Sequence, residues 1–551
     1  NSFTAGFQYW NNLIDSKTRA PLVTFPQSIS FGTNTNVPQQ SYQRKYQFRD
    51  DLSYNIGRHG LKGGVDYLWE PSLGGYFEFN STLEYDFQDL PSDILGNKGG
   101  LYPQGFQTPG AITGMSISNG DPKEDLPGGG KMLGLYFQDT WKTTSRLTLD
   151  LGLRYDRDFN LMATNAQAGS RTYQLLKALN SPFAGIPQDY KKGFSPRVGF
   201  AYDLTGNGNN VLRGGYGLYD AQTFLNIPLF MIQQANPTLF ATVFSISGSG
   251  PGTTCTSCTV PGTNIPLSQY RLGIDPVPTI PAPITQLTAG AVGRLMAPDY
   301  RNPYSQQWNI GFAHSFNANT VMEIEYIHEL GLHEEKRQIL NYIDPATGTR
   351  TLASAITALN PADFGPVPND ERHHGSVSGV VDLPWGFEVA PIMQVASARP
   401  YDATTGFTNV LGFGSGPLAA HALVPANDHN NLLFGTTQTS SALKTCYLNG
   451  SCVETHFDRL RGSPFFNLDT RLTKNIKIKE KSNLKLIFQA FDLTNRANYG
   501  NNYDGNVRHF NTDPTKSSFA TPLGYIGCNA NGCNRAIPIS FRAEFGAQFT
   551  F

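Results

Sequence analysis

Residues 135–159 read LYFQDTWKTTSRLTLDLGLRYDRDF, two alternating stretches with a short polar interruption at 143–146. Side chains of a β-strand point to opposite faces in turn, so a period of two predicts a strand with two unlike faces. In the second stretch, the residues of one face are Leu147, Leu149, Leu151, Leu153 and Tyr155. The residues between them are polar or glycine. The stretch therefore predicts a β-hairpin with an apolar and a polar face.

The same pattern recurs along the chain. It is found at 46–69, 194–220, 306–328, 375–397 and 465–493, and the C-terminal PISFRAEFGAQFTF (538–551) also alternates. With one strand at each terminus, these hairpins predict about fourteen strands. The fold class is therefore all-β and antiparallel.

The connections between the hairpins are much longer than the turns within them. They span roughly 11–40, 70–130, 160–192, 222–302, 333–371, 400–463 and 496–537, and we expect them to be structureless loops. Such loops are rare in soluble domains. An up-and-down sheet places alternate connections at opposite ends, so short turns lie on one side and long loops on the other. Outer-membrane barrels have this asymmetry.

Composition restricts the alternatives. The 551 residues contain no run of about 18 apolar residues, so no membrane-spanning helix is expected. With 15% charged residues, 12% aromatics, 56 Gly and 36 Pro, strands and turns are favoured over helices. The net charge of -1 gives no basic excess for nucleic acid, which is not an expected partner. A large soluble β-sandwich stays an alternative, whereas a propeller lacks its repeat.

Several of these segments resemble a known family. LYFQDTWKTTSRLTLDLGLRYDRD, FSPRVGFAYDLTGNGNNVLRGGYGLYD, NPYSQQWNIGFAH and LIFQAFDLTNRANYG resemble the barrel of TonB-dependent outer-membrane transporters, in particular the Oar-like branch. The resemblance implies a transmembrane β-barrel of the outer-membrane type, with short periplasmic turns and long extracellular loops, and about 14 strands of a barrel of about 22 in this chain. It also implies contact with the lipid bilayer and lipopolysaccharide of the bacterial outer membrane.

The resemblance implies active transport of a large ligand through a plugged barrel. Neither the plug domain nor the TonB-box nor the N-terminal domain is recognisable, so residues 1–551 are expected to be the C-terminal barrel part of a longer polypeptide. The TonB complex would act through segments outside this sequence. The terminal Phe551 is similar to the signal that the barrel assembly machinery reads. The alternatives are a self-contained porin-like passive channel and a surface-structural or adhesion barrel.

Charged residues that alternate with the apolar rows are predicted to face the lumen, because a charge on the lipid face is costly. They are Arg154, Asp156, Arg197, Asp203, Arg213, Glu323, Glu325, Asp469, Arg471, Arg542 and Glu544. We expect them to pair with one another or with a plug. Direct contact with a transported ligand is the alternative.

Six cysteines form three close pairs in polar loops. The pairs are Cys255 with Cys258, Cys446 with Cys452, and Cys528 with Cys533. Short spacing in Gly- and Asn-rich loops favours three local disulfides in an oxidising compartment. Zinc ligation is the competing interpretation.

No enzyme or cofactor motif is recognised. HELGLH (328–333) places its histidines five positions apart in a strand-like context, not four apart on a helix as a metalloprotease requires. A weak metal candidate is a cluster of His328, His333, His373 and His374 with Glu334 and Glu335 at the outer rim. Scattered loop residues are the simpler interpretation. The apolar segment FLNIPLFMIQQANPTLFATVF (224–244) marks a binding region or packing between loops.

Overall fold

The computed structural model describes residues 1–34, 36–77, 83–117, 124–235, 259–279, 295–334, 365, 367–368, 370–406, 421–434, 439–456, 458–479, 482–523, 528–529, 532–533 and 541–551. Its main element is an antiparallel sheet in which fourteen strands follow one another in chain order. They are β1 Ser2–Ile14, β4 Gln39–Ile56, β5 His59–Tyr76, β9 Gly130–Lys142, β10 Leu147–Phe159, β11 Gly193–Asp203, β12 Asn210–Asp220, β13 Tyr304–Asn317, β14 Thr320–Leu332, β15 His373–Leu383, β16 Phe387–Ala396, β21 Phe465–Lys479, β22 Ser482–Phe491 and β25 Arg542–Thr550. The predicted fold class is confirmed.

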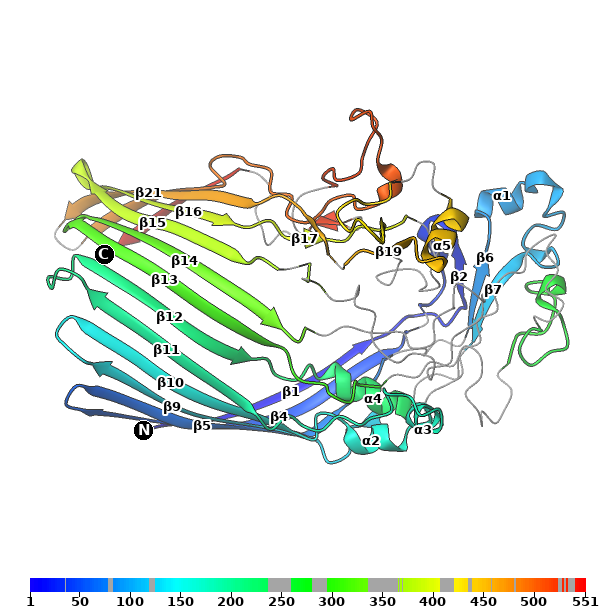
Figure 1. The fold of residues 1–551 in the computed structure, drawn as a ribbon, viewed down its shortest axis with the longest axis horizontal. Helices are drawn as coiled ribbons and strands as arrows, with labels where there is room; N and C mark the ends of the chain where they lie inside the picture. Colours follow the sequence, from blue (N-terminus) through cyan, green and yellow to red (C-terminus); the bar gives the residue numbers. More distant parts are fainter. Residues whose placement is uncertain are drawn as a thin grey trace.

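Short turns join alternate strand pairs at one end of the sheet, where both chain termini also lie (Figure 1). The turn between β4 and β5 uses Gly57 at φ 58°, and the turn between β15 and β16 uses Trp385 at φ 64° followed by Gly386 at φ 78°. Positive φ angles of this kind close tight hairpins. The long connections all leave from the opposite end (Figure 1). We call the two ends the turn end and the outer end.

The register gives the sheet two chemically different faces. Residues paired across neighbouring strands share a face, so Leu151 shares one with Val198, and Phe488 shares it with Phe545. This apolar face is open to solvent in the described part of the chain: Leu153 is 48% exposed, and Phe545 is 84% exposed. Among the described strands no second sheet covers these rows, which argues against the soluble sandwich. In the described residues no helix is long and apolar enough to cross a membrane.

The buried cores lie at the outer end, not against the apolar face. The largest one packs a small sheet with the segment around Tyr270. This small sheet consists of β2 Leu22–Phe25, β3 Ile29–Phe31, β6 Leu83–Phe87 and β7 Ile112–Ile117. A second core joins the outer ends of β5 and β9 to Leu161 and Met162 and to residues of two helices, α2 Thr164–Gly169 and α4 Asn226–Ala235.

The long connections therefore contain secondary structure, and the expectation of structureless loops is wrong for their described parts. Their helices are α1 Pro91–Leu95, α2 Thr164–Gly169, α3 Arg171–Ala178, α4 Asn226–Ala235 and α5 Ser440–Leu448. Short strands are β8 Glu124–Asp125, β17 Pro400–Tyr401, β18 Leu423–Pro425, β19 Cys452–Glu454, β20 Leu460–Arg461, β23 Cys528–Asn529 and β24 Gly532–Cys533. The 3-10 helices of these connections are η1 Pro26–Ser28, η2 Lys98–Gly100, η3 Gly105–Gln107, η4 Leu267–Gln269 and η8 Val507–His509, whereas η7 Pro384–Gly386 forms the short turn between β15 and β16. We call this region the outer cap.

Candidate functional site

The eleven charged residues singled out from the sequence all fall on one face of the sheet, opposite the apolar rows. Arg197 is opposite Gly152, and Arg213 is opposite Ala201, so both share the face of Arg154. The same pairing runs through Glu323 and Glu325 on β14 to Asp469 and Arg471 on β21, and on to Arg542 and Glu544 on β25. We call this surface the polar face.

Two contacts on the polar face span an intervening strand. Arg213 on β12 forms an ion pair with Glu323 on β14, across β13. The Tyr136 hydroxyl on β9 donates a hydrogen bond to Asp51 on β4, across β5. In both cases a glycine occupies the middle strand. A Cβ at Gly311 would lie 3.3 Å from Arg213 Nε, and one at Gly64 would lie 2.7 Å from Asp51 Oδ1.

Other charges of the polar face pair with close neighbours. Arg154 Nε lies 2.7 Å from Asp156 Oδ2, and Arg542 Nε lies 3.3 Å from Glu544 Oε1. The Arg197 guanidinium stacks 4.4 Å from the centre of the Tyr219 ring. These charges are therefore engaged within the sheet.

Carboxylates of the same set accept hydrogen bonds from nearby groups. Glu325 accepts from Asn309 Nδ2 at 3.0 Å, and Asp469 accepts from the backbone N–H of Asp492 at 2.8 Å. Asp203 accepts from the N–H groups of Gly206 and Gly208 and so shapes a hairpin turn. Most of the eleven charges singled out from the sequence are thus engaged on the polar face.

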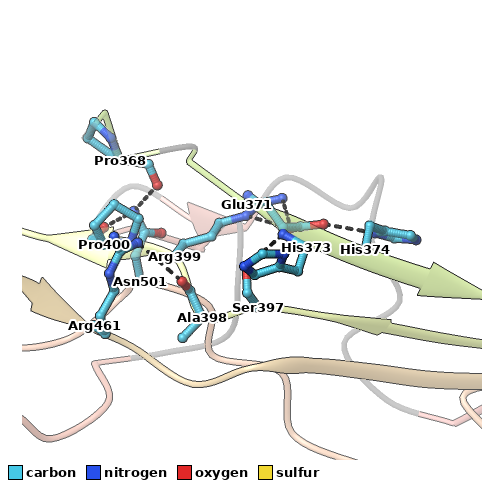
Figure 2. Close-up of polar contacts among 10 residues, drawn as sticks. All are labelled: Pro368, Glu371, His373, His374, Ser397, Ala398, Arg399, Pro400, Arg461 and Asn501. Carbon is cyan, nitrogen blue, oxygen red and sulfur yellow. Dashed lines mark hydrogen bonds and ion pairs between the residues drawn. The ribbon is translucent and has the colours of Figure 1, made fainter. Parts of the chain in front are cut away.

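At the outer end, Glu371 ties the start of β15 to the connection that follows β16 (Figure 2). Its carboxylate accepts from Arg399 Nε at 3.0 Å, and its other oxygen lies 3.0 Å from His374 Nδ1. Asn501 Nδ2 donates to the carbonyl oxygens of Pro368 and Pro400, at 2.8 and 3.1 Å. This network links three long connections above the polar face. A cluster with charges of both signs that bond to each other is suited to holding loops in place.

The weak metal candidate formed by the histidines does not assemble among the described residues. His328 and His373 share the apolar face, with ring centroids 5.5 Å apart, whereas His374 turns to Glu371 on the other face because adjacent residues alternate. His333 instead stacks on Tyr304 at 5.6 Å. Within the described ranges no group of three or more His, Cys, Asp or Glu side chains could hold a metal ion. Glu335 lies outside these ranges.

The structure describes two of the three cysteine pairs. Cys446 and Cys452 form a disulfide that joins the end of α5 to β19. The backbones of Cys528 and Cys533 are opposite each other in the β23–β24 hairpin. Cys255 and Cys258 lie outside the described residues, as does much of 224–244. The described part of that apolar segment includes α4, whose Leu229, Met231 and Ile232 are buried in the second core.

In the outer cap, two buried tyrosines lie close to each other and a third tyrosine is hydrogen-bonded to a carboxylate. Burial raises the pKa of Tyr85 and of Tyr270, whose hydroxyls lie 3.5 Å apart. The Tyr102 hydroxyl donates to Asp89 at 2.7 Å, and this bond, with the ion pair to Lys98, holds the pKa of Asp89 below its usual range. These contacts fix the small sheet and α1.

Sequence reasoning missed the residues that join loops to the sheet. Glu371 and Arg399 lie outside the alternating segments, so no periodic signal marks them. Glu70 is fully buried and lies 3.3 Å from Lys45 Nζ. Glu70 and Lys45 occupy strand positions that belong to the polar face. This position in the alternation was the available signal. Gly64 and Gly311 occupy polar-face positions of alternating strands. A glycine at such a position indicates that side chains of the two flanking strands meet across it.

The fold and its two faces define an antiparallel strand wall of the outer-membrane barrel class, with the apolar face toward lipid. A family model described as "Outer membrane beta barrel domain" matches residues 1–361 and 356–527. The chain belongs to this outer-membrane β-barrel family. Its location is therefore the bacterial outer membrane, with lipid and lipopolysaccharide around it.

Solved structures of similar fold include the outer membrane transporter YddB from Escherichia coli, at 11% identity and a TM-score of 0.41, with 100% of this chain and 59% of that chain covered. A mutant of the ferric enterobactin receptor PfeA from Pseudomonas aeruginosa has 11% identity and a TM-score of 0.36, covering 100% and 59%. The siderophore receptor PiuA from Acinetobacter baumannii has 10% identity and a TM-score of 0.34, covering 93% and 57%. The chain thus spans less than two thirds of these proteins. No curated protein matches the sequence.

Proposed function

We propose that this chain forms the wall of an active, TonB-dependent transporter for a large ligand, without catalytic activity. The observation that carries the proposal is the pair of sheet edges. In the described residues β1 pairs with β4 alone and β25 with β22 alone. An edge in lipid leaves backbone N–H and C=O groups without partners, at several kcal/mol for each group. We therefore propose that further strands complete the wall and widen the lumen.

The polar face supports this proposal. Its charges form pairs such as Arg213 with Glu323 and Arg154 with Asp156. A passive ion channel places rings of unpaired charge along its pore to select ions. A wall with neutralised pairs instead suits contact with a folded plug domain, whose removal by the TonB complex opens the path. The barrel assembly machinery, reading Phe551, is the proposed partner in insertion.

A passive porin-like channel is the second candidate, and one observation favours it. β1 runs from the turn end outward and β25 runs back toward the turn end, so these two edges have the relative direction that an antiparallel pair requires. Direct pairing would close a barrel from these fourteen strands alone, an even number within the known range.

Disulfide cross-linking between the two edges separates the candidates. Cysteine is placed at Ala5 of β1 and, in separate variants, at Ala543, Phe545 or Ala547 of β25, in the full polypeptide in its membrane. The transporter proposal expects no cross-link, since other strands stand between these edges. A pair at Phe7 and Tyr46, which are register partners, is the positive control. A cross-link between β1 and β25 would overturn the proposal in favour of the smaller barrel.

Conductance tests the lumen independently. The full polypeptide in a planar bilayer is expected to show no steady conductance, because a plug seals the barrel. A stable open conductance of the folded protein would support the passive channel.

A further inference from the structure

A group of basic side chains lies near the outer end of the apolar face, on β4, β9 and β10 and in the residues just before β11 and β13. Arg44 on β4 is opposite Tyr9, Lys131 on β9 is opposite Trp69 and Phe159, and Arg157 on β10 is opposite Leu133. Lys191 and Lys192 immediately precede β11, and Arg301 shortly precedes β13. We call these residues the basic outer arc: Arg44, Lys131, Arg157, Lys191, Lys192 and Arg301. They span a contiguous part of the sheet from β4 to β13.

The height of the arc agrees with the edge of the lipid layer. The apolar row of β10 starts at Leu147, and Arg157 follows ten positions later. At about 3.3 Å per residue and a tilt of about 40°, this separation spans about 25 Å along the membrane normal, which is the height of the apolar band of an outer-membrane barrel. Arg157 and Lys131 therefore lie where hydrocarbon gives way to headgroups in the outer leaflet.

Two arginines of the arc stack on aromatic rings. The Arg157 guanidinium lies 4.5 Å over the Phe159 ring, and its buried Nε has no hydrogen-bond partner among the described residues. Arg301 stacks on Tyr190 and Tyr304, at 4.7 and 4.2 Å, and its Nε is likewise without a partner there. Stacking fixes the direction of each guanidinium and keeps its positive charge, which can attract an anionic ligand.

One nearby carboxylate, Asp220, reaches the arc at Arg301, and two others are bound elsewhere. Asp220 accepts from Ser195 Oγ at 2.9 Å and lies 3.9 Å from Arg301. Asp189 accepts from the backbone N–H of Asn160. Asp158 lies on the polar face, where Thr223 Oγ1 donates to it at 2.6 Å. The ion pairs of the described residues include neither Lys131 nor Arg157, in contrast to the paired charges of the polar face.

We propose that the basic outer arc binds the phosphate groups of lipopolysaccharide, with Arg157 and Lys131 as the central contacts. The outer leaflet supplies a glycolipid with phosphates at the depth of these side chains. Guanidinium and ammonium groups form charge-assisted hydrogen bonds with phosphate oxygens, and Trp69 and Phe159 give the acyl chains an apolar surface. The proposal rests on the membrane location and is independent of the transported ligand.

The test measures binding of bisphosphorylated lipid A to the purified full polypeptide in phosphatidylcholine nanodiscs. The variant combines Lys131→Gln with Arg157→Gln, and we expect its affinity for lipid A to fall about tenfold or more. The control is Lys474→Gln, since Lys474 also lies on the apolar face but at the turn end. Its affinity should stay unchanged. Circular dichroism confirms that each variant is folded, and the charge-keeping pair Lys131→Arg with Arg157→Lys should retain most of the binding.

Three results would overturn the proposal. The first is unchanged lipid A affinity in the folded double variant. The second is equal binding of dephosphorylated lipid A by the unaltered protein. The third is equal displacement of lipid A by phosphatidylglycerol, which would identify a general attraction to anionic lipid. A change of oligomeric state in the double variant with unchanged lipid binding would assign the arc to contact with a second copy of the protein.

Discussion

Arg213 of β12 and Glu323 of β14 form an ion pair that crosses β13 over Gly311, whose missing side chain leaves the space in which the arginine lies. Tyr136 and Asp51 repeat this arrangement over Gly64. Each contact joins strands that are not hydrogen-bonded to each other. The polar face is therefore braced across strands.

A larger side chain at Gly311 should disturb this brace. We expect Gly311→Leu to lower the free energy of unfolding by about 1 to 3 kcal/mol, because the added atoms displace Arg213. Adding Arg213→Ala should recover part of the loss by removing the clash. Gly199 is the matched control, since a Cβ there meets no atom closer than 3.6 Å. Equal losses from Gly199→Leu and Gly311→Leu would contradict this account of the crossing.

Glu371 should control the order of the connection after β16. In Glu371→Gln the side chain keeps its shape but loses the charge that holds Arg399 and His374. We expect hydrogen exchange at 397–404 to speed up several-fold, with little change in the sheet. Asp513→Asn removes an exposed ion pair with Lys516 and should have no such effect. Unchanged exchange in Glu371→Gln would show that the network does not fix the loop.

The disulfide between Cys446 and Cys452 should stabilise its own part of the outer cap alone. Cys452 is buried beside Leu423 and Leu443. Replacing both cysteines by serine should weaken this region by about 2 kcal/mol, the value expected for closing a short loop. Hydrogen exchange at 440–454 measures the loss. Thermal unfolding of the sheet should not change, and a large fall in its midpoint would refute the local role.

Asp89 should make the small sheet of the outer cap sensitive to acid. Because Tyr102 and Lys98 hold the pKa of Asp89 below its usual range, the stabilisation is present above about pH 4 and is lost as pH falls through the lowered pKa. At pH 6, Asp89→Asn should therefore lower the temperature at which the near-ultraviolet circular dichroism of the buried tyrosines is lost. The difference from the unaltered protein should shrink at pH 3. A difference of equal size at both pH values would exclude ionised Asp89 as its cause.

The sheet was predictable because alternation is a local property. Each strand must separate lipid from water by itself. The alternation from Leu147 to Tyr155 therefore predicts which side chains of β10 lie on the apolar face. The count of fourteen strands followed from the same pattern. The shared face of Arg154, Arg197 and Arg471 is a direct consequence of that phase combined with antiparallel pairing.

The outer cap was not predictable in the same way. Its cores assemble from distant short segments, as when Tyr270 packs on Tyr85 and Ile112, and no single segment carries a period. The Glu371 network depends on which loops meet above the sheet. The histidines named as a weak metal candidate do not come together for a local reason: His373 and His374 are adjacent in β15 and must point to opposite faces.

The most direct test of the account is cysteine labelling along β10 in the intact outer membrane. Single cysteines replace Leu149, Asp150, Leu151, Gly152, Leu153 and Arg154, and each is treated with a water-soluble maleimide and, separately, with a lipid-soluble one. We predict a period of two, in which Leu149, Leu151 and Leu153 react with the lipid-soluble reagent alone. Labelling of all six positions at similar rates by the water-soluble reagent would contradict the claim that the apolar face of this sheet lies against lipid.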